Sequence, residues 1–151
     1  NNTPDLVGSI QRLLEENAVY KKQAEEYARQ KAQMLADELA GKAETLGEVK
    51  LIKLTECEDA AMLREAALAL QKSQVGTALV AAYQVDGKPS LVLMYSADLV
   101  AAGKNAGKDI RNAAKFIMGG GGGQPGFASA GGKNPGGLSD ALNALIEAVK
   151  A

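Results

Sequence analysis

Gly119-Gly-Gly-Gly-Gly-Gln-Pro-Gly-Phe-Ala-Ser-Ala-Gly-Gly-Lys-Asn-Pro135 is the most informative stretch of this 151-residue chain, and it holds eight of the chain's 17 glycines. A flexible linker would be expected to carry serines and charges. The apolar Phe127 and its neighbouring alanines stand between two glycine groups and indicate that the segment packs. Ordering glycine carries an entropic penalty, so a packed run implies close approach to another group. The stretch is therefore predicted to be an ordered glycine-rich loop whose exposed amides can face a phosphate, base or ribose.

Two nucleotide-binding motifs can be excluded for this stretch. Gly121–Gly126 formally matches G-x-G-x-x-G, but it follows a predicted helix and opens none, so the context of a dinucleotide fingerprint is missing. Gly132-Lys133-Asn134 fails the P-loop pattern, because Asn134 stands where Ser or Thr is needed. These matches follow from the glycine content.

Residues 105–118, directly before the glycines, are predicted to form a helix. Its apolar face consists of Ile110, Ala113, Ala114 and Ile117. The opposite side carries a basic stripe: Lys104 (just before the helix), Lys108, Arg111 and Lys115. Several spaced cations suit a phosphate backbone and require little reading of base sequence. The alternative is an ordinary solvated helix face.

The charge distribution supports a nucleic-acid partner, although the net charge is only −1. Residues 103–135 carry five basic side chains against Asp109 alone, a net charge of +4. The remaining segments are all acidic on balance, with −3 over residues 5–48 and −1 over each of 49–102 and 136–151. The positive charge is thus concentrated in the glycine-rich part of the chain.

Residues 5–40 are predicted to form one long helix, about 50 Å at 1.5 Å per residue, ending at Gly41. Its heptad seam is Leu6, Ile10, Leu13, Asn17, Tyr20, Ala24, Tyr27, Lys31 and Met34. The helix cannot bury this seam by itself, so it needs a second copy or another part of a longer parent chain. The alternative is a linker helix that lies on the globular part of the chain.

The rest of the chain predicts a small mixed sheet with helices. The expected order is a strand at 49–54, a helix at 59–72, strands at 76–83 and 91–95 joined by the hairpin signal Asp86-Gly87-Lys88-Pro89, and a closing helix at 138–150. The predicted fold class is therefore α/β (α+β). It comprises a helical connector or oligomerisation segment over 1–47 and an α/β module with a glycine-rich loop over 48–151.

The composition argues against catalysis and membrane insertion. Histidine is absent, which removes the commonest general base and metal ligand. The single Cys57 cannot form an internal disulfide or a zinc cluster, and it is interpreted as a half-buried core residue. The acidic run Glu56–Asp59 is interpreted as a helix N-terminal cluster. The sequence contains no apolar run of 18 residues and no export signal.

The order Met118-Gly-Gly-Gly-Gly-Gly-Gln-Pro-Gly-Phe-Ala-Ser-Ala-Gly-Gly-Lys133, followed by Leu138, Ala141 and Leu142, resembles the glycine motif of the DHHA1-type domain. That domain ends alanyl-tRNA synthetases and also occurs in DHH-family phosphoesterases. The chain follows the synthetase version: a glycine run, a polar residue, Pro, two variable residues and Ala-x-Ala-Gly-Gly. The phosphoesterases tend to carry a histidine after the glycines, where this chain has Gln124. Gln124 also departs from the Arg that the family often has before the proline.

The resemblance implies a non-catalytic accessory domain in the cytoplasm that grips the outer corner of tRNA(Ala) and joins the aminoacylation and editing modules. ATP, magnesium and zinc would belong to those other modules, so this domain is expected to hold no cofactor. The alternatives are a homo-oligomerisation module without RNA contact and the substrate-binding domain of a DHH-type phosphoesterase. The predicted RNA-binding residues are Lys104, Lys108, Arg111, Lys115, Gly119, Gly120, Gly121, Gly122, Gly123, Gln124, Pro125, Ala128, Ala130, Gly131, Gly132 and Lys133.

Overall fold

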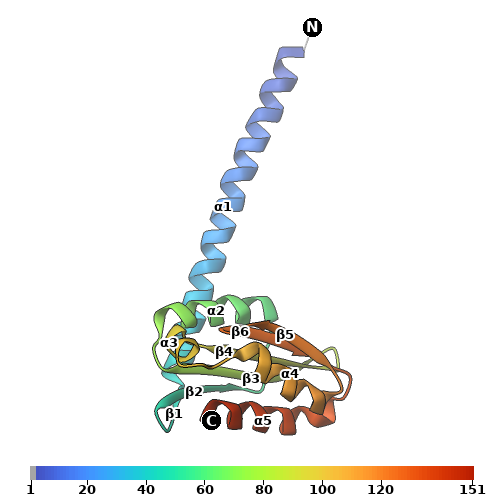
Figure 1. The fold of residues 1–151 in the computed structure, drawn as a ribbon. Coiled ribbons are helices and arrows are strands. Elements are labelled where there is room, and N and C mark those ends of the chain that lie inside the picture. The colour runs from blue at the N-terminus through green and yellow to red at the C-terminus, as the bar shows by residue number, and fades with distance from the viewer. Residues whose placement is uncertain (1–2) are drawn as a thin grey trace.

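The computed structural model describes residues 3–151 and centres on a six-stranded sheet (Figure 1). The strand order is β1 (Glu44–Leu46), β2 (Val49–Leu54), β3 (Thr77–Val85), β4 (Lys88–Tyr95), β6 (Phe127–Gly131) and β5 (Gly120–Gln124). β2 and β3 are parallel and joined through a helix, whereas every other neighbouring pair is antiparallel. The mixed sheet predicted from the sequence is therefore confirmed, and three strands join the three predicted ones: β1 and the two strands of the glycine-rich stretch.

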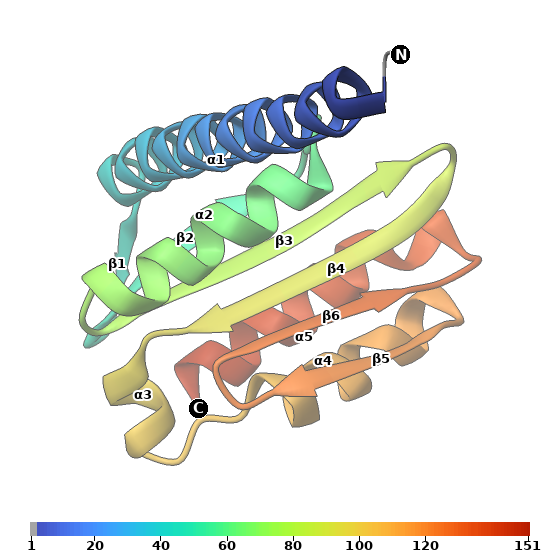
Figure 2. The same cartoon turned by 90° about the horizontal axis from the view of Figure 1, so that it is seen from above.

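Helices cover both faces of the sheet (Figure 2). The helices are α1 (Thr3–Gly41), α2 (Ala60–Ser73), α3 (Ala97–Ala101), α4 (Ala106–Ala114) and α5 (Leu138–Lys150), with 3-10 turns η1 (Lys115–Ile117) and η2 (Pro135–Gly137). Successive residues of each strand point to opposite faces of the sheet, so their side chains enter two apolar cores, one on each face. One core joins the sheet to α4 and α5, and the other joins it to α2 and the end of α1. The hairpin β5–β6 lies at the sheet edge between these two layers.

The helix α1 leaves the globular body for most of its length (Figure 1). Only its C-terminal part packs on α2, where Ala32, Ala36 and Leu39 are buried. The large apolar side chains of the rest are exposed, including Tyr20 at 67% and Tyr27 at 60%. The alternative of a helix lying on the globular part is therefore wrong. No other element within residues 3–151 packs against the apolar seam of α1.

The glycine-rich stretch is not a loop, and that prediction is corrected here. It forms the hairpin β5–β6, which turns at Pro125 and Gly126. The physical reason lies in the alternation of the second strand, because Ala128 and Ala130 enter the core while Ser129 between them is exposed. Small core residues at a spacing of two are a strand pattern, and the surrounding glycines masked it.

Several local predictions are confirmed by the backbone. Asp59 caps α2 and accepts hydrogen bonds from the amides of Ala61 (3.0 Å) and Met62 (3.1 Å). The β3–β4 hairpin turns at Asp86 and Gly87, both with positive φ, as the Asp-Gly signal predicts. The helix predicted over 105–118 is shorter, because α4 ends at Ala114 and tightens into η1 before Met118.

Candidate nucleic-acid interface

The helix α4 runs antiparallel to the edge strand β5 at backbone-contact distance. The Ala106 amide donates to the Pro125 carbonyl (2.9 Å) at one end, and the Gly119 amide donates to the Ala114 carbonyl (3.0 Å) at the other. Between them, a Cβ added to Gly107 would lie 2.7 Å from the Gly123 carbonyl oxygen. A side chain at Gly107 would therefore prevent this close packing of α4 against β5.

The glycines of the stretch divide into closed and open positions. A Cβ on Gly121 or Gly123 would overlap strand β6, and one on Gly119 or Gly132 would overlap neighbouring backbone. In contrast, a Cβ on Gly120 would meet nothing within 4 Å. A Cβ on Gly131 would meet only the Pro89 carbonyl oxygen at 4.0 Å, and one on Gly122 only the Arg111 guanidinium, from 3.4 Å. None of these glycines has a positive φ, so close approach and not a left-handed conformation explains the closed ones.

Three predicted cations project from α4 and η1 beside β5. Lys108, Arg111 and Lys115 are all exposed, and none forms an ion pair within residues 3–151. The guanidinium of Arg111 reaches the edge strand, since it borders the space beside Gly122. We call these three residues the α4 stripe. The structure thus brings the stripe and part of the glycine run to one edge of the sheet.

Lys104 does not belong to the α4 stripe, and its inclusion is corrected. Its ammonium group donates to the carbonyls of Ala148 (2.7 Å) and Val149 (3.1 Å) in the last turn of α5. A cation at this position satisfies carbonyls that lack helical partners and stabilises the negative end of the helix dipole. Lys104 is therefore a structural cap.

Two further predicted contacts are also corrected. Ala128 and Ala130 point into the core with α4 and α5, at 1% and 8% exposure, so their side chains cannot reach a ligand. Gln124 and Pro125 are exposed at the tip of the hairpin, and Lys133 is exposed after β6. The exposed residues of the stretch are thus its tip, Ser129, Lys133 and the glycines Gly119, Gly120, Gly121, Gly123 and Gly131.

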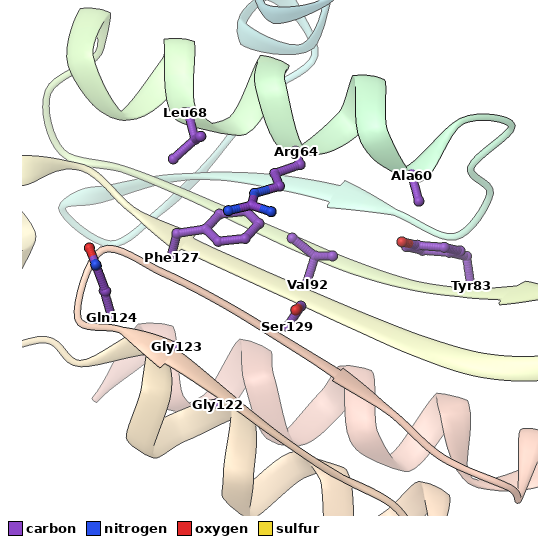
Figure 3. A pocket seen from close by; sticks show the side chains of 10 residues that line it. All are labelled: Ala60, Arg64, Leu68, Tyr83, Val92, Gly122, Gly123, Gln124, Phe127 and Ser129. Carbon is purple, nitrogen blue, oxygen red and sulfur yellow. The ribbon is translucent and has the colours of Figure 1, made fainter.

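A groove of about 530 Å³ lies on the other side of the hairpin, between α2 and strands β4, β6 and β5 (Figure 3). The guanidinium of Arg64 lies over the Phe127 ring, 5.9 Å from its centroid, and Gln124 closes one end. Sequence reasoning did not find Arg64 or this groove. The available signal was the row Ala60, Arg64 and Leu68, spaced four apart on a predicted helix, because all three line the groove.

No group of three or more Cys, Asp or Glu side chains within residues 3–151 is placed to hold a metal ion. Over the same residues, no helix has the length and apolar character needed to cross a membrane.

Comparisons with known proteins fit this geometry. The profile of the DHHA1 domain matches residues 48–151, and the chain therefore belongs to the DHHA1 domain family. It is 41% identical over 150 residues to alanine–tRNA ligase of Parabacteroides distasonis, covering 99% of this chain and 17% of the ligase. The alanine–tRNA ligase of Bacteroides fragilis is 40% identical over 148 residues, with 97% of this chain and 17% of the ligase covered. The chain spans about one sixth of the length of these relatives.

Solved structures identify the part of the ligase that the chain resembles. The crystal structure of the C-Ala domain from Aquifex aeolicus alanyl-tRNA synthetase matches with a TM-score of 0.63 and 27% identity, covering 72% of this chain and 98% of that domain. A DHH-domain protein of the s1p family of ribosomal proteins shares the fold, with a TM-score of 0.58 and 13% identity over 89% of this chain and 32% of that one. Within the family, the chain corresponds to the C-terminal domain of alanyl-tRNA synthetases.

Proposed function

We propose that this chain is the tRNA-binding part of an alanine–tRNA ligase and that it grips the outer corner of tRNA(Ala). The observation that carries the proposal is the position of Arg111, which extends from the α4 stripe to the open glycine Gly122 on the edge strand. Cations and accessible backbone therefore share one surface. A surface of this kind binds the phosphates of a nucleic-acid backbone and makes few contacts that depend on base sequence.

The α4 stripe is suited to an RNA backbone because its three cations are spaced along about two helical turns and form no ion pair with an acidic side chain within residues 3–151. Asp109, the one carboxylate of residues 103–135, accepts a 2.7 Å hydrogen bond from the Tyr95 hydroxyl. That bond ties the carboxylate to the core instead of to the neighbouring lysines and arginine. The stripe keeps its positive charge for a partner, and the expected interaction weakens steeply with salt.

The groove between α2 and the hairpin supplies a different kind of contact. Phe127 is half-buried at its floor, and Arg64 lies over the ring. An aromatic ring and a planar guanidinium both stack on unpaired bases, such as those at the corner of a folded tRNA. We assign this groove to a splayed base and the α4 stripe to phosphates.

The parent protein would be a much longer ligase. Relatives of this chain are ligases about six times its length, so aminoacylation, editing and the ATP, magnesium and zinc that serve them would reside in other parts. α1 would connect those modules to the RNA-binding body. The 151-residue chain is expected to bind tRNA without turning over any substrate.

The test is a titration of an alanine tRNA transcript into the purified chain at several salt concentrations. Changing Lys108, Arg111 and Lys115 to Ala should weaken binding and reduce the slope of log K against log salt by roughly two to three units, about one per lost phosphate contact. The matched control changes Lys42, Lys50 and Lys53 to Ala, which removes the same charge from β2 and from the segment after α1. Equal effects of the two triple variants would reject the proposed face.

A second proposal rests on α1. Its apolar residues Leu6, Ile10 and Leu13 are between 49% and 64% exposed, and a helix of this kind is marginal in water without a partner. We propose that a second copy of the chain covers this seam in a homodimer, with the tRNA-binding bodies at the free ends of the paired helices.

A further inference from the structure

A second basic cleft lies on the hairpin, away from the α4 stripe. It has a volume of about 540 Å³ and is lined by Lys88, Pro89, Ser90, Met118, Gly119, Gly131, Gly132 and Lys133. Lys88 begins strand β4 and Lys133 follows strand β6, so the cleft sits at the end of the sheet where the β3–β4 turn lies. We call it the Lys88–Lys133 cleft.

The floor of this cleft is accessible backbone. Gly131 has room for a side chain, because an added Cβ would meet only the Pro89 carbonyl oxygen at 4.0 Å. Its partner across the hairpin, Gly120, would meet nothing within 4 Å. Neither lysine forms an ion pair within the described chain. Two free ammonium groups thus flank a stretch of strand without side chains, which is a suitable surface for an anion.

The cleft and the groove share one face of the sheet. Paired residues of antiparallel strands point to the same face. Ser129 pairs with Val92 and Gly122, and Gly131 pairs with Ser90 and Gly120. Ser129, Val92 and Gly122 line the groove, whereas Ser90 and Gly131 line the cleft. From Phe127 to Gly131 the two sites are joined by roughly 13 Å of strand at about 3.3 Å per residue.

We propose that the Lys88–Lys133 cleft binds a phosphodiester of the same RNA, next to a nucleotide held at Arg64 and Phe127. The inference rests on the proposed tRNA-binding function and deepens it. The RNA then contacts the hairpin on two sides, with phosphates along the α4 stripe at the edge and a short unpaired segment along the open glycines of β5 and β6. The partner is identified by its chemistry: an unpaired base with a flanking phosphate.

The charge test uses the whole chain, an alanine tRNA transcript and fluorescence anisotropy over a range of KCl concentrations. Lys88→Ala with Lys133→Ala should reduce the salt slope by about one to two units. The control Lys50→Ala with Lys53→Ala removes the same charge, and both of its residues lie on β2, near the far edge of the sheet. This control should keep the parent slope.

The steric test uses Gly131→Leu, which fills the floor of the cleft and removes no charge. It should weaken tRNA binding at least several-fold with the parent salt slope, while an unchanged melting curve confirms the fold. Parent affinity in both the double lysine variant and Gly131→Leu would overturn the inference. If the Lys108, Arg111, Lys115 triple variant still loses affinity in that case, the proposed function stands without the cleft. If the triple variant also binds normally, both proposals fail.

Discussion

The Tyr95 hydroxyl donates a 2.7 Å hydrogen bond to the Asp109 carboxylate and thereby ties the central strand β4 to the helix α4. Tyr95 is fully buried. Burial, followed by the bond to Asp109, raises the pKa of Tyr95 far above its usual range. The bond links the core to the helix that carries the α4 stripe, and it engages the nearest carboxylate, which forms no ion pair with the stripe.

Tyr95→Phe should lower the free energy of unfolding at neutral pH by about 1–2 kcal/mol, because a half-buried carboxylate loses its donor. Above pH 10, near the ordinary tyrosine pKa, the unfolded parent releases the Tyr95 proton while the folded parent keeps it. The stability of the parent therefore falls with rising pH through this group, and the variant lacks this contribution. Urea unfolding of both proteins from pH 7 to 11 should show their difference shrinking above pH 10. A difference that stays constant or grows would contradict this account.

The closed and open glycines predict opposite outcomes at adjacent positions. Gly121→Ala should destabilise the chain by about 2 kcal/mol or more, since its Cβ would overlap the backbone of β6. Gly120→Ala should be tolerated, because the space beside it is open. Thermal melts of the two variants decide the matter. Equal melting temperatures would show that β5 and β6 are not packed as described.

Lys104 and Lys108 lie four residues apart, but substitutions at the two positions should affect different properties, stability at Lys104 and tRNA binding at Lys108. Lys104→Ala removes the donor to the carbonyls at the end of α5 and should cost about 1 kcal/mol of stability with little change in tRNA affinity. Lys108→Ala should leave the melting curve unchanged and reduce the salt slope by about one unit. If Lys104→Ala instead reduced the salt slope and left the melting curve unchanged, Lys104 would belong to the binding surface.

The seam of α1 predicts self-association. Tyr20→Ala with Tyr27→Ala should weaken the dimer at least about tenfold, the equivalent of 1.4 kcal/mol, and leave tRNA contacts largely unchanged. Gln11→Ala with Gln33→Ala, on the opposite side of the helix, is the control. Sedimentation velocity over a concentration series measures both. A parent chain that stays monomeric at high concentration refutes the dimer, and a selective loss of RNA affinity in the tyrosine variant would make these rings base-stacking residues.

Much of the fold follows from the sequence because its elements carry local signals. The alternation of β2, the Asp59 cap and the Asp86-Gly87 turn each specify their own conformation, and α5 occupies the predicted range. The hairpin β5–β6 was missed because glycine has little strand preference, and the surrounding glycines masked the alternation of Ala128, Ser129 and Ala130 in β6. The position of β5 also depends on tertiary contacts with α4.

The site was predictable only in part for the same reason. Helical periodicity placed Lys108, Arg111 and Lys115 on one exposed side. Lys104 precedes α4, and its partners lie 44 and 45 residues away, so periodicity could not show that it caps another helix. Arg64 and Lys88 meet the glycine stretch only through the sheet order. Their contribution to the site depends on the topology.

Hydrogen–deuterium exchange of the chain with and without an alanine tRNA transcript shows whether α4 and the hairpin contact the tRNA. We expect slower exchange of backbone amides on tRNA binding in peptides covering residues 105–133, which contain α4 and the hairpin, and no change over 44–54, which lie at the far edge of the sheet. Protection confined to α1 or to β1 and β2, with α4 and the hairpin exchanging as in the free chain, would contradict this expectation.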